Sequence, residues 1–167
     1  TQWLNERGGV ESDVTVTRLA DDCFAVVTTG TSTMRDLDWL RRGIPADAHV
    51  TVTDITSSEA VISLMGPRSR ALLAAMSDAD LSSEGFPFGT AREIDLGLAI
   101  VRAARLTYVG ELGWELYIPT EFATHVYDEI VSVGDAFGLR HAGYHALDSL
   151  RIEKAYRHWG HDMSDED

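Results

Sequence analysis

Residues 106–119, LTYVGELGWELYIP, decide how this chain folds. A Gly-Glu-Leu-Gly turn leads into the segment 114–118, whose residues alternate strictly between the two faces of an extended strand. The apolar residues that share one face are Trp114, Leu116 and Ile118. Glu115 and Tyr117 share the other face. We expect the first face to join the core, and the second to offer the Glu115 carboxylate to a small ligand that carries paired N–H donors.

The segments on either side of this strand predict further strands interleaved with helices. Alternation over 13–19 and 23–29, around an Ala-Asp-Asp turn, is typical of a hairpin, and residues 1–4 read as a strand that enters a Gly-Gly turn. Further strands are expected at 49–55, 60–65, 91–95 and 98–106. Helices are expected at about 31–42, 68–76, 121–137 and 145–156. This order indicates an α+β fold with antiparallel sheets backed by helices.

Two local predictions concern burial near the first hairpin. Met34, Leu37 and Leu40 recur at helical spacing, so we expect them to form one apolar stripe. Cys23 lies at the start of a strand, where we expect a buried packing residue rather than a nucleophile. As the single cysteine of the chain, it also excludes an internal disulfide and fits a reducing compartment.

Composition excludes several classes of protein. With 167 residues and 44% hydrophobic content, the chain can form one full core or two small ones. No apolar run approaches the roughly 20 residues that a membrane-spanning helix needs. A net charge of −13 leaves no global basic footprint for nucleic acid, although Arg102 with Arg105 could meet a small anion. The chain has no initiator Met and no targeting leader, so we expect it to begin inside a larger domain.

Three residues are candidates for chemistry: Asp13, Tyr108 and Glu115. Asp13 follows a Gly-Gly turn at the start of a strand and could face a developing cation or an amine proton, although capping a turn is the commoner role of such an Asp. Glu115 could accept two parallel N–H bonds from a pterin-like ring, or be an ordinary outward strand residue. Tyr108 could stack on a ring, or be a core tyrosine at an interface.

Two other kinds of site do not fit the sequence. The histidine pairs 141/145 and 158/161 each enclose a glycine and match no zinc-binding helix motif, so we predict no metal site. The glycines of 8–9 and 110–113 are too few for a dinucleotide fingerprint. We therefore expect nothing in this chain itself to bind a flavin or a nicotinamide.

Five segments, in this order, resemble the aminomethyltransferase (glycine cleavage T-protein) family. They are LNERGGVESDVTVTRL (4–19), AVISLMGPRSRALL (60–73), FPFGTAREI (86–94), LTYVGELGWELYIP (106–119) and AGYHALDSLRIEKAYRHWG (142–160). Together they span nearly the whole chain. The ending DSLRIEKAYRHWG is most similar to the folate-binding domain in the C-terminal half of dimethylglycine and sarcosine dehydrogenases. The resemblance implies a fragment of the aminomethyltransferase fold.

The resemblance also implies a tetrahydrofolate site. By motif position, Asp13 matches the family's catalytic carboxylate, while Tyr108 and Glu115 match the tyrosine and glutamate that contact the pterin. Two positions depart from the T-protein branch. Leu147 stands where that branch has an arginine that helps to hold folate, and Ser12 stands where it often has a second acidic residue. Both departures favour the dehydrogenase branch.

In that branch, the implied parent protein oxidises an N-methylamine at an FAD held by an N-terminal domain, and the one-carbon unit passes to tetrahydrofolate. Residues 1–167 would then be the central part of the folate-binding domain. The flavin domain, a tyrosine-bearing segment and a C-terminal β-rich domain would lie outside the chain, so we expect this fragment alone to be inactive. Its partners would be folate, a methylamine substrate and its own flavin domain. The implied location is the bacterial cytoplasm, or the mitochondrial matrix in a eukaryote.

Two alternatives remain at this point. One is a stand-alone T-protein-like aminomethyltransferase or a folate-dependent demethylase. The other is a relative that keeps the scaffold as a non-catalytic folate-binding or assembly module. The sequence does not reveal the methylamine, the attachment of the flavin or the oligomeric state.

Overall fold

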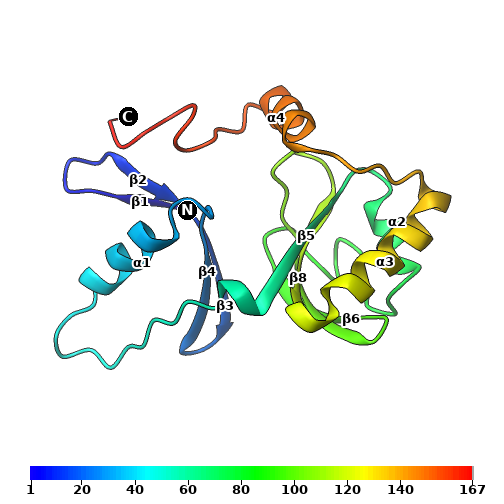
Figure 1. Cartoon of the computed structure of the whole chain (residues 1–167), viewed down its shortest axis with the longest axis horizontal. Helices are drawn as coiled ribbons and strands as arrows, with labels where there is room; N and C mark the ends of the chain where they lie inside the picture. The colour runs from blue at the N-terminus through cyan, green and yellow to red at the C-terminus, as the bar shows by residue number, and fades with distance from the viewer. Residues whose placement is uncertain (167) are drawn as a thin grey trace. The chain divides into compact units, whose positions relative to one another are not determined.

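The computed structural model describes residues 1–166, and Asp167, the last residue of the polar tail, lies outside the described residues. The chain divides into two compact units (Figure 1). Unit 1 comprises Thr1–Asp54 and the segment that begins at Arg157, and unit 2 comprises Ile55–Tyr156. No helix of the described residues is long and apolar enough to cross a membrane.

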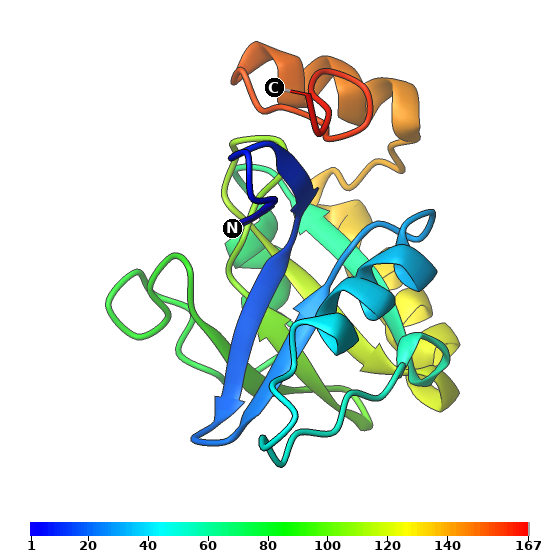
Figure 2. The same ribbon diagram turned by 90° about the vertical axis from the view of Figure 1, so that its left-hand side faces the viewer.

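Unit 1 contains two antiparallel strand pairs and one helix. Its elements are β1 (Gln2–Leu4), β2 (Val10–Asp13), β3 (Thr15–Ala20), β4 (Cys23–Val27) and α1 (Thr33–Arg42). Strand β3 pairs with β4, as the sequence pattern predicted, and β1 pairs with β2, a strand that was not predicted (Figures 1 and 2). In the first pair, Gln2 lies opposite Asp13. The candidate carboxylate therefore lies at the end of a paired strand.

The turn between β1 and β2 is organised by one side chain. The Asn5 carboxamide oxygen accepts hydrogen bonds from the backbone N–H groups of Arg7 and Gly9, each at 3.0 Å. Gly9 has a second reason to be glycine, because a Cβ there would lie 2.2 Å from the carbonyl oxygen of Asp165. The Asn5 side chain thus helps to hold the turn, and the absence of a side chain at Gly9 leaves room for the C-terminal segment of unit 1.

A buried carboxylate lies at the centre of unit 1. Asp36 of α1 is only 2% exposed, and it accepts hydrogen bonds from the Ser12 hydroxyl at 3.0 Å and from the Thr28 hydroxyl. Its other oxygen accepts from Nε and Nη2 of Arg35 at 3.1 and 2.9 Å. The predicted stripe is therefore wrong in part. Met34 is 75% exposed, because α1 turns its buried face toward these polar donors.

Arg35 also ties the C-terminal segment to the first strand pair. Its guanidinium lies 4.3 Å from the ring centroid of Trp159 and donates to the Glu11 carbonyl. The Trp159 indole N–H donates to the Val10 carbonyl at 2.6 Å. Residues that are far apart in sequence therefore close unit 1 around one arginine.

Unit 2 is a four-stranded antiparallel sheet with helices. Its elements are β5 (Glu59–Met65), α2 (Ser69–Ala74), β6 (Ala91–Leu96), β7 (Ala99–Ala104), β8 (Gly113–Pro119), α3 (Ala123–Gly134) and α4 (Tyr144–Glu153), with short 3₁₀ turns at Thr56–Ser58, Thr120–Phe122 and Asp135–Phe137. The strand order is β5-β8-β7-β6. Strand β8, which contains the alternating segment 114–118, thus pairs with a strand on each side.

The core of unit 2 lies on one face of β8. Trp114, Leu116 and Ile118 are each 0% exposed, as the alternation predicted. They belong to one apolar cluster with Leu72 and Leu73 of α2 and with Val126 and Ile130 of α3. The helix predicted over 121–137 is present as α3 with a 3₁₀ turn at each end, and it buries Val126 and Ile130 in this cluster. The observed mixture of helices and antiparallel sheets is the α+β class expected from the sequence.

Two further predictions are wrong. Residues 49–55 form no strand, because no neighbouring backbone pairs with them. Cys23 does begin a strand, yet it is exposed rather than buried. It lies opposite Ala20 at the turn end of the β3–β4 hairpin, just beyond a shift in register, where a two-stranded sheet offers little cover.

Removing the Asp36 carboxylate should destabilise unit 1. In Asp36→Ala, the buried hydroxyls of Ser12 and Thr28 lose their acceptor and Arg35 loses its ion pair, so we expect the free energy of unfolding to fall by about 3 kcal/mol. Asp36→Asn keeps an acceptor oxygen and should cost less. Urea denaturation followed by tryptophan fluorescence measures both.

Asp38 on the same helix provides the matched control. Its side chain is 63% exposed and pairs with Arg42 in solvent, so Asp38→Ala should change stability by no more than about 0.5 kcal/mol. Equal losses for the two alanine variants would show that the buried network does not hold unit 1 together.

Candidate functional site

Glu115 lies in the middle of β8 on the face opposite the core. Its register partners are Ser63 of β5 and Ala104 of β7. The side chain is half-buried, and its Oε2 atom accepts a hydrogen bond of 2.6 Å from the Tyr117 hydroxyl. One oxygen of the carboxylate is therefore held by the protein. A carboxylate oxygen has two lone pairs, so acceptor capacity remains for N–H donors of a ligand.

Tyr117 is nearly inaccessible to solvent, at 4% exposure. Burial, followed by the hydrogen bond to Glu115 and the charge of that carboxylate, raises the pKa of Tyr117 well above its ordinary value. The phenol therefore keeps its proton and remains a donor throughout the physiological pH range. The alternation of β8 placed Tyr117 on the Glu115 face, but the hydrogen bond between the two residues was not predicted.

Two more charged residues join the same face from the neighbouring strands. Arg102 of β7 lies opposite Tyr117, and its guanidinium lies 4.5 Å from the centroid of the tyrosine ring. Its Nη2 atom lies 2.6 Å from Oε2 of Glu59, the first residue of β5. Arg105 donates to the Phe86 carbonyl at 2.6 Å. The two arginines proposed as an anion cluster are thus engaged inside unit 2, and sequence reasoning missed the role of Glu59.

Tyr108 lies in the loop between β7 and β8, four residues beyond Ala104 rather than at the end of the strand. The loop uses Gly110 at a φ of +69°, and Lys154 Nζ lies 3.3 Å from a carboxylate oxygen of Glu111. Tyr108 and Glu115 therefore belong to the same unit and flank one turn. Their joint use by a ligand stays a prediction.

Asp13 is the last residue of β2 in unit 1, so the prediction that it begins a strand is wrong, because the strand is interrupted at Val14 between β2 and β3. Its side chain is 39% exposed, and its Oδ1 atom accepts a hydrogen bond of 3.1 Å from the Gln2 carboxamide. Ser12, the preceding residue, turns to the opposite face and is anchored on Asp36. Asp13 and Glu115 thus lie in different units, and their convergence on one ligand stays a prediction.

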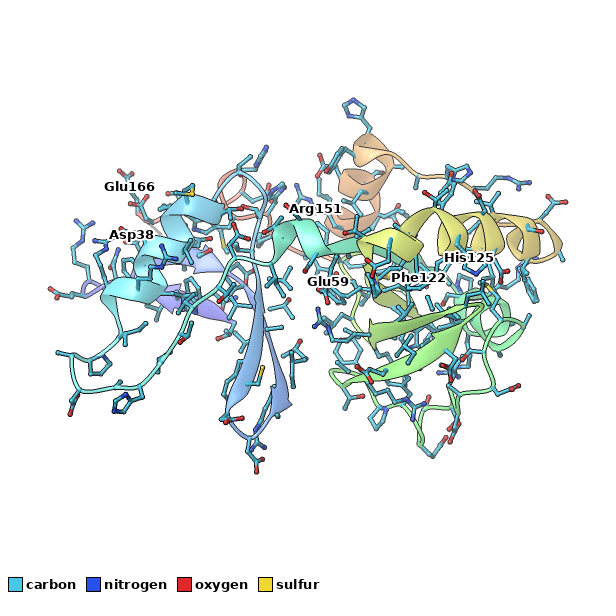
Figure 3. The ribbon with its side chains drawn as sticks, turned by 60° about the horizontal axis from the view of Figure 1, so that its bottom comes forward. Asp38, Glu59, Phe122, His125, Arg151 and Glu166 are labelled. Carbon is cyan, nitrogen blue, oxygen red and sulfur yellow. The ribbon has the colours of Figure 1, made fainter. Side chains whose placement is uncertain are left out.

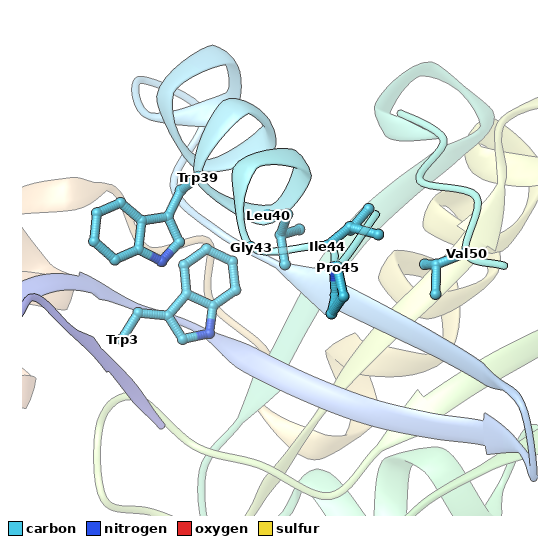
Figure 4. A pocket seen from close by; sticks show the side chains of 7 residues that line it. All are labelled: Trp3, Trp39, Leu40, Gly43, Ile44, Pro45 and Val50. Atoms are coloured by element: carbon cyan, nitrogen blue, oxygen red, sulfur yellow. The ribbon is translucent and has the colours of Figure 1, made fainter. Parts of the chain in front are cut away.

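A hollow in unit 1 offers a contrast to these polar positions. It has a volume of about 380 Å³ and is lined by Trp3, Trp39, Leu40, Gly43, Ile44, Pro45 and Val50 (Figure 4). No carboxylate and none of the three candidate residues belongs to this lining. The side chains that line this hollow therefore offer no carboxylate to paired N–H groups.

Within residues 1–166, no group of three or more histidine, cysteine or acidic side chains is arranged to hold a metal ion. The rings of His158 and His161 stack at 4.2 Å. His125 Nε2 accepts a hydrogen bond of 3.1 Å from the backbone N–H of Leu98 (His125 is labelled in Figure 3).

The whole chain, residues 1–167, matches the family described as the GCVT N-terminal domain. It is 42% identical over 163 residues to a 4-methylaminobutanoate oxidase (formaldehyde-forming) of Paenarthrobacter nicotinovorans and 41% identical over 182 residues to human mitochondrial sarcosine dehydrogenase. It is also 38% identical over 165 residues to the mitochondrial regulatory subunit of mouse pyruvate dehydrogenase phosphatase. These alignments cover 98–100% of this chain but only 19–20% of each relative.

The fold agrees with a solved structure of the same family. The crystal structure of glycine cleavage system aminomethyltransferase T from Bartonella henselae superposes with a TM-score of 0.81 at 28% sequence identity. The match covers 99% of this chain and 42% of that protein.

The relatives thus include bacterial and mitochondrial proteins, and both dehydrogenases and an aminomethyltransferase. The chain spans about a fifth of the dehydrogenase relatives and less than half of the aminomethyltransferases. This chain therefore belongs to the GCVT N-terminal domain family, has the T-protein fold over the part that it spans, and is related to the sarcosine and dimethylglycine dehydrogenases.

Proposed function

We propose that this chain is the tetrahydrofolate-binding, one-carbon-transfer module of a flavin-dependent N-methylamine dehydrogenase of the sarcosine or dimethylglycine type. The observation that carries the proposal is the Glu115 carboxylate, held on a central strand beside a buried donor. Two of the relatives support the substrate class by their names. Sarcosine and 4-methylaminobutanoate are both N-methyl amines, and oxidation of the latter forms formaldehyde.

Glu115 suits the pterin end of folate. A pterin ring presents an amide N–H and an exocyclic amine side by side, and a carboxylate accepts such a pair through two parallel hydrogen bonds. Tyr117 occupies only part of the acceptor capacity of Oε2. Oε1 and the remaining lone pair of Oε2 would receive the ring. Tyr108, from the adjacent loop, would stack against it.

Asp13 would act at the other end of the reaction. Tetrahydrofolate supplies the amine nitrogens that take up the one-carbon unit. The partly exposed Asp13 carboxylate would attract the cationic methylamine-derived substrate, and its Oδ2 atom would accept the proton that the amine releases, while Oδ1 stays bonded to Gln2.

The proposed function implies a domain arrangement with which the coverage of the relatives is compatible. In the proposed parent protein, residues 1–167 form the central part of an aminomethyltransferase-like folate-binding domain, with an FAD domain upstream and a β-rich domain downstream. The dehydrogenase relatives leave room for both, since this chain covers about a fifth of them. The protein would work in the bacterial cytoplasm, or in the mitochondrial matrix if it is eukaryotic.

A non-catalytic role is the second candidate. The relative from mouse pyruvate dehydrogenase phosphatase is a regulatory subunit by name and is 38% identical to this chain. In that case the scaffold would bind folate or assemble with a partner without turnover. A stand-alone aminomethyltransferase is less favoured, because the Thermoanaerobacter aminomethyltransferase is only 30% identical.

Glu115→Gln should weaken tetrahydrofolate binding by the full-length parent protein by about 10- to 100-fold. The substitution keeps the shape but replaces one acceptor oxygen with an amide N–H that opposes a ligand donor. Isothermal titration calorimetry with the reduced folate measures the change. Asp95→Asn is the matched control, because Asp95 is an exposed carboxylate on β6 of the same sheet. Equal affinity of the two variants would remove Glu115 from the site.

Asp13→Asn should uncouple oxidation from transfer in the parent protein. We expect substrate oxidation and folate affinity to be retained, while formation of 5,10-methylenetetrahydrofolate falls at least about 100-fold and free formaldehyde accumulates. Asp21→Asn, at the exposed tip of the β3–β4 hairpin, controls for the loss of charge in unit 1. Unchanged transfer by Asp13→Asn would point to a different base, whereas absence of transfer in the unsubstituted parent protein would favour the non-catalytic candidate.

A further inference from the structure

Tyr117 lies two positions beyond Glu115 on β8. Residues i and i+2 of a strand share a face, which lets the long Tyr117 side chain reach back to the glutamate. The resulting hydrogen bond, from the Tyr117 hydroxyl to Glu115 Oε2, is 2.6 Å long. Since Tyr117 is 4% exposed, water has little access to compete for its hydroxyl.

Tyr117 is itself held in place from the neighbouring strands. The Arg102 guanidinium lies 4.5 Å from the centroid of its ring, and the side chain of Arg102 is only 14% exposed. Glu59, labelled in Figure 3, pairs with Arg102 at 2.6 Å and is itself 26% exposed. A chain of contacts therefore crosses three strands, from Glu59 of β5 through Arg102 of β7 to Tyr117 and Glu115 of β8.

These contacts restrict the orientation of the Glu115 carboxylate before a ligand binds. The terminal torsion of a glutamate is broad, so a free carboxylate would rotate and lose that freedom when a ligand binds. A carboxylate that is oriented during folding does not incur this cost at binding. The Tyr117 hydroxyl also keeps its proton as the pH rises, because burial and the neighbouring carboxylate raise the pKa of Tyr117 above its ordinary value.

We propose that Tyr117 is a positioning residue for the Glu115 carboxylate, and that the Arg102–Glu59 pair holds the Tyr117 ring in the orientation that this requires. This inference rests on the proposed function, in which Glu115 receives the pterin. Tyr117 touches Glu115 and does not contact the ligand. Its hydroxyl selects which lone pairs of the carboxylate face the ligand.

Tyr117→Phe tests the inference, because it removes only the hydroxyl and leaves the ring under Arg102. In the full-length parent protein, we expect the Kd and the KM for tetrahydrofolate to rise about tenfold with kcat unchanged. Tyr127→Phe on α3 is the matched control, since the Tyr127 side chain is 44% exposed and its ring stacks on His141. That control should leave Kd, KM and kcat unchanged.

A double-mutant cycle separates positioning from general packing. If Tyr117 acts through Glu115, Tyr117→Phe should have no further effect on the Kd in the Glu115→Gln background. Additive losses would overturn the inference, as would wild-type affinity in Tyr117→Phe alone. Arg102→Lys, which removes the planar stack, should weaken binding in the same direction and by less.

A second measurement separates failure of this inference from failure of the proposed function. The same cycle in urea denaturation without folate reports whether the two side chains couple in the free protein. Coupling without any effect of Glu115→Gln on folate binding would refute the proposed ligand site and, with it, this inference. No coupling, with a clear effect of Glu115→Gln on binding, would overturn the positioning role alone and leave the ligand site standing.

Discussion

The two-residue alternation of β8 is the constraint on which unit 2 depends. Strand β8 pairs with β5 on one side and β7 on the other, so two partner strands fix its register. One face buries Trp114 and its apolar companions completely, and the other carries Glu115 and Tyr117. A slip of a single residue would exchange the two faces, placing a carboxylate in the core and a tryptophan in the site. Stability and the candidate site are therefore specified by the same register.

Much of the fold could be predicted because its signals are local. The β3–β4 hairpin, β8 and α3 each carry a complete periodic pattern within their own residues. The failures involve information from distant residues. The burial of Asp36 depends on Ser12, which is 24 positions away. The prediction for α1 considered only the spacing of its apolar residues, so it did not identify a carboxylate on the buried face. Residues 49–55 alternate suitably but have no partner strand, which local sequence does not reveal.

The candidate site was predictable to a similar extent. Alternation placed Glu115 and Tyr117 on one face, away from the core. The contact from Glu59 to Arg102 spans 43 positions and depends on the pairing of three strands, so no local pattern predicts it. Asp13 is a different case. Its position after a Gly-Gly turn suits a capping residue better, and its catalytic role was suggested by the resemblance to a family rather than by its surroundings.

If Glu115 binds folate as proposed, the charge of the chain makes the orientation of its carboxylate more important than long-range electrostatic attraction. With a net charge of −13, the protein offers no long-range attraction to an anionic ligand, and folates carry carboxylates. Affinity must then come from short-range contacts that depend on direction, of which paired N–H bonds to a carboxylate are the strongest available. Such bonds weaken steeply when the acceptor is misaligned. In the proposed role, the buried hydroxyl of Tyr117 and the stacked guanidinium of Arg102 would supply that alignment, so that a strongly acidic protein could use one more carboxylate as a selective acceptor.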